Sequence, residues 1–458
     1  MHPKLFLPLL ALTALLAACQ SQNNTQLTDP AESKRPEVSM KPLPGDEAAA
    51  LERLDRMILP LYPQEGGQMP DPEQIVERIL QQLTLRQKIG QRFITGFSGT
   101  KMSSSTKNLI EQGDIGGLML TRGNIRNRDQ VRELTEELQV TARTHNPGIG
   151  LFIAVDQEGG RVTRLDLDSL TRFPAPYYWG EYKDPHYVEA AAYIISREAL
   201  ALGCNLNLAP VLDLYDTPDD SVVGDRSMGT NPVQVGERGV YYLSGARRAG
   251  IAVVAKHFPG HGRTTVDSHH SLPVVDVSEK TLLNRDLLPF QMVIRHDVDA
   301  IMTAHILYPQ IDPDFPVTLS SIFLRGLLRG KLGFQGVIIS DDIEMGALSS
   351  RYTPEEVLRY GINAGVDILL EYGSFDVLKL IDEVHTMVEA GEIDKVVIAA
   401  AHIIPSQFHV VYPQLFELHW GLANAGTALI VVMGDLKLEI LAHKAIQVFD
   451  RFGVWASD

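Results

Sequence analysis

Ala252-Val253-Val254-Ala255-Lys256-His257, followed by Phe258-Pro259-Gly260-His261-Gly262, is the stretch that decides the fold. Its first part is a short apolar run of strand length, and the proline and glycines behind it mark a loop. Lys256 and His257 stand where the apolar run ends. The stretch therefore predicts a buried strand that carries ionisable groups at its carboxyl end.

Seven further apolar runs share these features, and amphipathic helical stretches separate them. The eight candidate strands are 92–97, 116–120, 151–156, 205–214, 252–257, 300–306, 336–341 and 366–371. The candidate crossover helices include 129–145, 187–202, 232–249, 279–296 and 320–332. Parallel strands need such crossovers, so these units predict an α/β fold, a (β/α)8 TIM barrel, over residues 71–394.

Ionisable residues end six of the eight candidate strands. They are Asp156, Asp213, Lys256 with His257, His305, Asp341 and Glu371. In a TIM barrel the chemistry lies at the carboxyl ends of the strands. The pattern therefore predicts a shared pocket lined by these side chains.

Asp267-Ser268-His269 belongs to the long loop behind the 252–257 run. Residues two apart share one side of an extended chain, so the Asp267 carboxylate could hold the His269 tautomer and form an acid/base dyad. The alternative is a loop histidine merely capped by its neighbour. The several histidines of this loop could also indicate a zinc site. The sequence has no HExxH pair and no second ligand cluster, so we expect no metal and no cofactor.

Ile338-Ile339-Ser340-Asp341-Asp342 places two carboxylates behind an apolar strand. A carboxylate facing the barrel mouth suits nucleophilic attack on an anomeric carbon. Asp342 has a second reading, as the cap of a helix that begins near Ile343.

Four motifs together resemble the bacterial β-N-acetylglucosaminidases of glycoside hydrolase family three. They are Asp156-Gln157-Glu158-Gly159-Gly160-Arg161-Val162, Asp225-Arg226-Ser227-Met228-Gly229, the Lys256–His269 segment and Ser340-Asp341-Asp342. The resemblance spans about residues 71–391 and implies that Asp341 is the nucleophile of a retaining mechanism and His269 the acid/base, with Asp267 behind it. It also implies that sugar-binding positions fall on Asp156, Arg164, Arg226, Lys256 and His257. The alternative for each of these five is a structural ion pair.

The histidine acid/base departs from the two carboxylates usual in retaining glycosidases. The β-glucosidases of the same family resemble a two-domain design and take a glutamate from the second domain. The loop dyad therefore favours N-acetylglucosamine over glucose, in peptidoglycan fragments or related envelope glycans. A catalytically silent sugar-binding lipoprotein, or a phosphorylase that uses phosphate as acceptor, stays open as an alternative.

The first residues resemble a lipoprotein signal peptide, with Lys4, an apolar run from Leu5 to Leu16, and then Ala17-Ala18-Cys19. We expect residues 1–18 to be removed, Cys19 to be acylated and residues 19–70 to form a tether to the membrane of the cell envelope. An ordinary cleaved signal is the alternative. Cys204 is the only other cysteine.

The composition fits a globular enzyme, with 45% hydrophobic and 21% charged residues. The formal net charge of −16 excludes a nucleic-acid partner, because phosphate binding needs clustered Lys and Arg. An oligosaccharide containing N-acetylglucosamine is the expected partner. Residues 395–458 form a C-terminal extension to which the sequence assigns no role.

Overall fold

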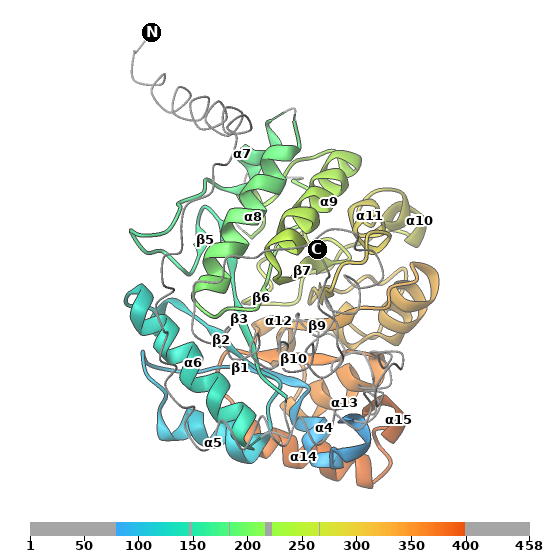
Figure 1. Cartoon of the computed structure of the whole chain (residues 1–458). Helices are drawn as coiled ribbons and strands as arrows, with labels where there is room; N and C mark the ends of the chain where they lie inside the picture. The colour runs from blue at the N-terminus through green and yellow to red at the C-terminus, as the bar shows by residue number, and fades with distance from the viewer. Residues whose placement is uncertain (1–78, 146–148, 183, 216–221, 265, 399–458) are drawn as a thin grey trace, which may run out of the picture. The chain divides into compact units, whose positions relative to one another are not determined.

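The computed structural model describes residues 79–145, 149–182, 184–215, 222–264 and 266–398. In this part of the chain, parallel strands close into a barrel in the order β1-β10-β9-β8-β7-β6-β3-β2, which confirms the predicted TIM barrel (Figure 1). The barrel strands are β1 (Phe93–Gly96), β2 (Gly117–Leu120), β3 (Phe152–Val155), β6 (Leu206–Asn207), β7 (Ala252–Phe258), β8 (Ala300–Thr303), β9 (Val337–Asp342) and β10 (Ile368–Glu371). A separate antiparallel hairpin, β4 (Gln157–Gly159) with β5 (Val162–Thr163), follows β3.

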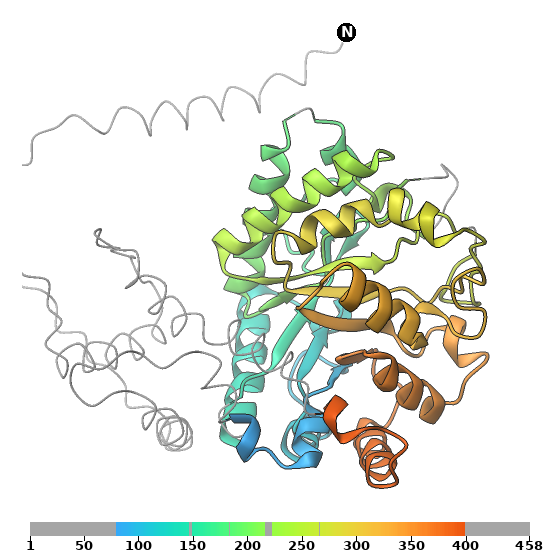
Figure 2. The same ribbon diagram turned by 90° about the vertical axis from the view of Figure 1, so that its right-hand side faces the viewer.

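Helices surround the barrel on its outer side (Figure 2). They are α4 (Leu85–Gly90), α5 (Ser104–Gly113), α6 (Arg128–His145), α7 (Pro176–Gly180), α8 (His186–Ala201), α9 (Pro232–Ala249), α10 (Glu279–Asn284), α11 (Leu288–Ile294), the π-helix η5 (Ile322–Lys331), α12 (Gly346–Ser349), α13 (Pro354–Ala364), α14 (Val377–Glu389) and α15 (Lys395–Ile398). Short 3-10 turns lie at η2 (Arg122–Asn124), η3 (Gly224–Arg226) and η4 (Val317–Leu319).

Helix α13 illustrates how local sequence sets the boundaries. Thr353 and Glu356 form a capping box at its start, with Pro354 in the first turn, where a missing N–H costs nothing. Gly365 ends the helix at φ 115°, a left-handed conformation that favours glycine. The sequence thus fixes both the length of α13 and the point where the chain turns into β10.

Alternate residues of each barrel strand point inward and pack together, including Ile94, Met119, Phe152, Val254, Met302 and Ile339. The residues between them face the helices and belong to a second, larger apolar cluster. The barrel is therefore a filled core, and the polar chemistry is confined to its ends.

Several predicted elements differ in their bounds from those observed, and proline explains two of these differences. The helix expected over 279–296 is broken into α10 and α11, because Pro289 lies in the first turn of α11 and cannot donate an N–H to a preceding turn. The strand expected over 205–214 is shortened to β6 plus one bridge from Val211 to Lys256, since Pro210 again lacks a donor for the ladder.

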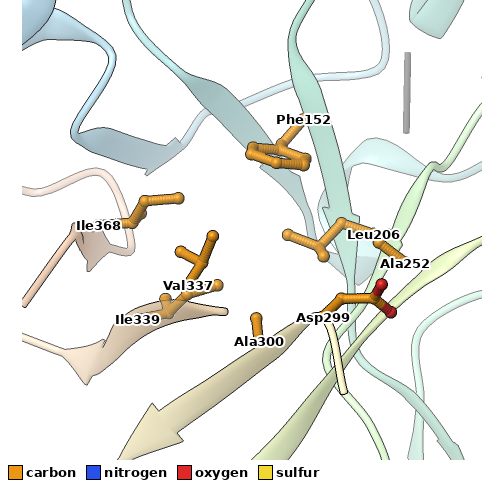
Figure 3. Close-up of a pocket in the computed structure, with 8 residues that line it drawn as sticks. All are labelled: Phe152, Leu206, Ala252, Asp299, Ala300, Val337, Ile339 and Ile368. Carbon is orange, nitrogen blue, oxygen red and sulfur yellow. The ribbon is translucent and has the colours of Figure 1, made fainter. Parts of the chain in front are cut away.

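A small apolar pocket lies at the amino-terminal end of the barrel, opposite the polar strand ends. Figure 3 shows Phe152, Leu206, Val337 and Ile368 converging on it, with Asp299 at its edge. This is the end of a TIM barrel associated with stability rather than catalysis, so the pocket is not a candidate substrate site.

Helix α15 is the described part of the extension that was expected from residue 395. Ile398 is buried, and the backbone oxygen of Val397 accepts a hydrogen bond from Arg92 at 2.9 Å. The extension therefore begins packed against the barrel. Among the described residues, no helix is both long and apolar enough to cross a membrane. Cys19 and the predicted tether lie outside the described residues.

Candidate active site

A buried network of charges occupies the carboxyl ends of β3 and β7. The Lys256 ammonium lies 2.8 Å from Asp156 Oδ1 and 2.7 Å from Glu158 Oε1, and all three side chains are almost fully buried. Arg226 donates two hydrogen bonds to Glu158, at 2.9 Å from Nε and 2.7 Å from Nη2. Arg164 Nη2 lies 3.3 Å from Asp156 Oδ2. Three cations thus converge on two carboxylates.

Both carboxylates are held in their charged form. Burial alone would raise their pKa values, but Lys256 and Arg164 hold the pKa of Asp156 below its ordinary value. Arg226 and Lys256 likewise depress the pKa of Glu158 far below its ordinary value, against the effect of burial. The network therefore offers fixed charges and donors to a polar ligand.

Glycines and tight packing hold Glu158 in place. Gly159 and Gly160 have φ values of 100° and 58°, and a Cβ on Gly160 would lie 2.6 Å from the Ala175 backbone. Only glycine allows the chain to turn this closely under α7, so the turn presents Glu158 to Lys256. Glu158 was not among the sequence-predicted site residues, although it lies two residues from Asp156 in a strand, where alternate side chains share one face.

Tyr372 is a second residue that the sequence did not predict. Its hydroxyl donates to Asp156 Oδ2 at 3.0 Å, from the residue that follows β10. The contact joins β10 to β3 across the barrel mouth. Its position directly after an apolar strand was the available signal, although the strand-end pattern pointed to the adjacent Glu371.

Asp213 orients His257. Its Oδ2 lies 2.6 Å from His257 Nδ1, and its Oδ1 accepts the backbone N–H of His261 at 2.7 Å. Burial raises the pKa of Asp213, but the two histidines outweigh it and the pKa is lowered. Arg226 Nη2 lies 3.4 Å from His257 Nε2, so the Asp213–His257 pair joins the ion network.

Asp341 lies at the end of β9 within the field of these groups. Burial would raise its pKa, but His257, His305, the Asp342 N–H and Lys256 together lower it. The Asp342 N–H donates to Asp341 Oδ1 at 2.9 Å. The sequence predictions for Asp156, Arg164, Arg226, Lys256, His257 and Asp341 thus fall in one connected region, although their roles stay predictions.

His305 supports the turn behind Asp341. It is fully buried, with Nδ1 2.7 Å from the Thr318 hydroxyl and Nε2 2.9 Å from the backbone oxygen of Asp342. If the Thr318 hydroxyl donates to Nδ1, Nε2 carries the proton and donates to that oxygen. Burial lowers the pKa of His305, and the charge of the neighbouring Asp341 opposes that shift.

Asp342 does not cap a helix beginning at Ile343, because the next helix, α12, starts at Gly346. Its Oδ1 instead accepts the Glu344 N–H at 3.1 Å in a tight turn. Burial, Glu344 and Asp341 raise the pKa of Asp342 to about 7, despite the Glu344 N–H, which opposes them.

Asp267 and His269 lie on the loop between β7 and α10. Asp267 Oδ1 is 2.7 Å from His269 Nδ1 and also accepts the His269 N–H at 2.9 Å. The His269 side chain is 63% exposed. The Gly346 N–H donates to the His269 backbone oxygen at 3.0 Å, which fixes this part of the loop to the start of α12, close behind Asp341. The expected contact is present, and the acid/base role stays a prediction.

Glu371 is not part of the pocket expected from the strand ends. Ile368 and Leu370 face the barrel interior and Leu369 faces the helices, so Glu371 lies on the outer side of β10. It is fully buried, accepts the Gly373 N–H at 2.6 Å, and has a pKa raised to about 8, chiefly by burial. Among the described residues, no group of three or more His, Cys, Asp or Glu is arranged to hold a metal ion.

Several known proteins are similar to this chain in sequence and in fold. A model of the glycosyl hydrolase family 3 N terminal domain matches residues 84–405. Beta-hexosaminidase A of Pseudoalteromonas piscicida is 35% identical over 63% of this chain and 53% of its own length, so the chain spans about half of that relative. The structure of a glycoside hydrolase family 3 beta-N-acetylglucosaminidase from Paenibacillus sp. str. FPU-7 is similar with a TM-score of 0.68 and 38% identity, over 77% of this chain and 65% of that one. NagZ from Neisseria gonorrhoeae, in complex with N-trifluoroacetyl-D-glucosamine, is similar with a TM-score of 0.58 and 31% identity, over 69% of this chain and 97% of that one.

Proposed function

The chain belongs to glycosyl hydrolase family 3, and we propose that it is a retaining β-N-acetylglucosaminidase acting on terminal β-linked N-acetylglucosamine of peptidoglycan fragments or related envelope glycans. The observation that carries this proposal is the placement of Asp341. It ends β9 beside His257, His305 and Lys256, which keep its carboxylate ionised in a largely buried site. An ionised, desolvated carboxylate next to a rigid set of polar groups suits attack on a sugar carbon.

In the proposed first step, an Asp341 oxygen bonds to the anomeric carbon while the bond from that carbon to the glycosidic oxygen breaks. His269 donates its Nε2 proton to the departing oxygen, so the aglycone leaves as a neutral alcohol. Asp267 accepts a hydrogen bond from His269 Nδ1 and stabilises the protonated ring. The product of this step is a glycosyl ester of Asp341.

In the second step, His269 removes a proton from water, and the hydroxyl oxygen attacks the anomeric carbon. The ester bond breaks, Asp341 returns to its carboxylate form and the histidine is protonated again. Two displacements at one carbon retain the β configuration.

The ion network would bind the sugar. Asp156, Arg164, Arg226, Lys256 and His257 would bond the hydroxyls and the acetamido group. These groups already pair with one another, so they need little rearrangement to present donors and acceptors. A buried polar partner left without its hydroxyl or amide is costly, which favours N-acetylglucosamine over sugars that lack the acetamido group.

We further propose that the protein is held at the envelope by a lipid on Cys19, with residues 19–70 as tether. The support is the sequence pattern alone: a basic residue, an apolar run too short for a spanning helix, and Ala17-Ala18-Cys19.

The enzymatic proposal is tested with aryl β-N-acetylglucosaminide, β-glucoside and β-xyloside, with the anomeric form of the first product recorded by NMR. We expect preference for the N-acetylglucosaminide and initial release of the β-anomer. Initial release of the α-anomer would exclude retention. Binding without turnover would favour the silent lipoprotein, and release of a sugar 1-phosphate in phosphate buffer would favour the phosphorylase.

A further inference from the structure

Three exposed tyrosines lie in the connection from α7 (Pro176–Gly180) to the first turn of α8 (His186–Ala201). Tyr178 is 58% exposed, and Tyr182 and Tyr187 are each 53% exposed. The rings of Tyr182 and Tyr187 lie against each other, with centroids 4.8 Å apart and planes inclined by 31°. We call these three residues the tyrosine platform. Large aromatic rings left in water cost free energy, so a group of them marks a surface for a ligand.

The tyrosine platform lies on the same end of the barrel as Asp341. Tyr178 is in α7, within the connection from β3 to α8, and Tyr187 is at the amino-terminal end of α8. In a TIM barrel such connections and helix starts lie at the carboxyl ends of the strands. Figure 1 shows α7 close to α8 near the top of the view.

Helix α7 is fixed to the segment that carries Arg226. Arg238 donates to the backbone oxygens of both Gly180, at the end of α7, and Met228, the latter at 2.9 Å. A Cβ on Gly180 would collide with the Met228 backbone oxygen, so the two segments approach as closely as glycine permits. Met228 is two residues from Arg226. The tyrosine platform is therefore held rigidly relative to the ion network.

Further rings connect the tyrosine platform to the strand ends. Tyr177 packs on Tyr215 at 5.5 Å between centroids and on Tyr178 at 5.8 Å. Tyr215 is two residues from Asp213, the carboxylate that orients His257. The rings of Tyr215, Tyr177 and Tyr178 thus form a line from the chain just after Asp213 to the exposed ring of Tyr178.

We propose that the tyrosine platform binds the outer sugar units of an uncharged β-linked N-acetylglucosamine chain while its terminal sugar occupies the pocket beside Asp341. This inference rests on the proposed function and adds the substrate class, an oligosaccharide rather than a single glycoside. Sugar rings present C–H faces that pack on aromatic rings, and their hydroxyls can bond the tyrosine hydroxyl.

Charge favours a sugar chain over an anionic lipid surface. Acidic residues surround the tyrosine platform: Glu181 and Asp184 are exposed beside it, and Glu189 lies one turn along α8. Among the described residues, Arg248 lies 3.0 Å from Glu189 and His186 lies 2.7 Å from Asp184, while Lys183, between Tyr182 and Asp184 in the sequence, lies outside the described residues. A membrane rich in anionic lipid would be repelled here, whereas a neutral glycan would not.

The test compares the Tyr178→Ser and Tyr182→Ser/Tyr187→Ser variants of the full chain with Ile322→Ser. Ile322 is the matched control, because it is 49% exposed at the start of η5, behind β8, on another side of the barrel. Initial rates are measured on aryl β-N-acetylglucosaminide and on N-acetylglucosamine tetrasaccharide. Each lost ring should raise KM for the tetrasaccharide roughly 3- to 10-fold. The kcat should stay unchanged, because contacts to distant sugars stabilise the bound substrate and the transition state equally. Rates on the aryl glycoside, and all rates of Ile322→Ser, should stay at wild-type level.

The outcomes separate the two proposals. If wild type hydrolyses the aryl glycoside but the variants keep its KM for the tetrasaccharide, the tyrosine platform is not a sugar site and the proposed function stands. If wild type hydrolyses neither substrate, the proposed function fails. Binding of the tetrasaccharide is then measured by calorimetry. Equal affinity of wild type and the tyrosine variants would show that the tyrosine platform does not bind the sugar chain. The proposal would also be overturned if the tyrosine variants sedimented less with phosphatidylglycerol vesicles than wild type but kept wild-type kinetics on the tetrasaccharide. That result would indicate that the tyrosine platform binds a lipid surface.

Discussion

Replacing Glu158 by glutamine should be among the most destabilising single changes in the barrel mouth. The wild-type cluster sets the carboxylates of Asp156 and Glu158 against the three cations Arg164, Arg226 and Lys256. Glu158 accepts three short contacts, two from Arg226 at 2.9 and 2.7 Å and one from Lys256 at 2.7 Å. The neutral amide of the Glu158→Gln variant leaves the three cations of the cluster with the Asp156 carboxylate alone. It also places the amide N–H₂ group against the N–H donors of Arg226 or Lys256. Uncompensated buried charge of this kind costs about 3–5 kcal/mol.

Two comparisons separate this cost from a general effect of substitution. Lys256→Met leaves two balanced pairs, Asp156 with Arg164 and Glu158 with Arg226, so its loss of unfolding free energy should be smaller than that of Glu158→Gln. Glu392→Gln breaks the surface pair with Arg359, in which both side chains are more than a third exposed, and should cost less than about 1 kcal/mol.

The assay is urea unfolding at neutral pH and below pH 4.5, the ordinary pKa of a glutamate. The folded-state pKa of Glu158 is depressed, so its stabilisation is fully present above the unfolded-state pKa and is lost as the pH falls. The difference between wild type and Glu158→Gln should therefore narrow in acid. Equal stability of the two proteins at neutral pH, or a difference that does not change with pH, would refute the view that Glu158 is an ionised partner of Arg226 and Lys256.

Four further expectations follow from the same structure. Asp341→Ala should lose turnover of aryl N-acetylglucosaminide and regain part of it with azide, giving an inverted glycosyl azide by NMR, whereas a retained product would exclude Asp341 as nucleophile. His269→Ala should slow the cleavage of substrates with poor leaving groups roughly 10²–10⁴-fold, and the cleavage of activated aryl glycosides much less, when initial rates are measured in a stopped assay. Glu371 has a raised folded-state pKa of about 8, so stability should fall as the pH rises from 4.5 to 8, and Glu371→Gln should flatten that fall in urea unfolding. Cys19→Ala should leave the membrane fraction, and mass spectrometry should find a diacylglyceryl group on wild-type Cys19.

The strands of the barrel could be predicted because each is a short apolar run with a polar end. Their lengths were less predictable where proline intervened. Pro210 ends the ladder of β6 and Pro289 divides a helix, yet neither interrupts the hydrophobic period on which the predictions relied. Hydrophobic pattern reports burial, whereas the end of an element depends on which backbone donors are missing.

The strand-end pattern could predict that Asp156, Lys256 and Asp341 lie at one end of the barrel, but not which side chains pair with one another there. Asp267 and His269 are neighbours in sequence, and their contact follows from that spacing. Tyr372 reaches Asp156 from the other side of the barrel, and nothing in either segment specifies the partner. The strand-end pattern also placed Glu371 in the pocket, whereas its side chain lies on the outer side of β10. Position at a strand end alone does not tell which side of the sheet a side chain occupies.

The surroundings of Asp341 give a physical reason for a histidine at the acid/base position. Asp342, the carboxyl next in sequence, has a pKa raised to about 7, partly because it lies close to Asp341 and Glu344. A further carboxylate near the leaving group would meet the same repulsion and would also weaken the ionisation of the nucleophile. Asp267 with protonated His269 has no net charge before the proton is transferred, so the waiting acid adds no net charge beside Asp341. The loop therefore carries the expected proton donor on an exposed side chain, apart from the carboxyl groups of Asp341, Asp342 and Glu344 that crowd the end of β9.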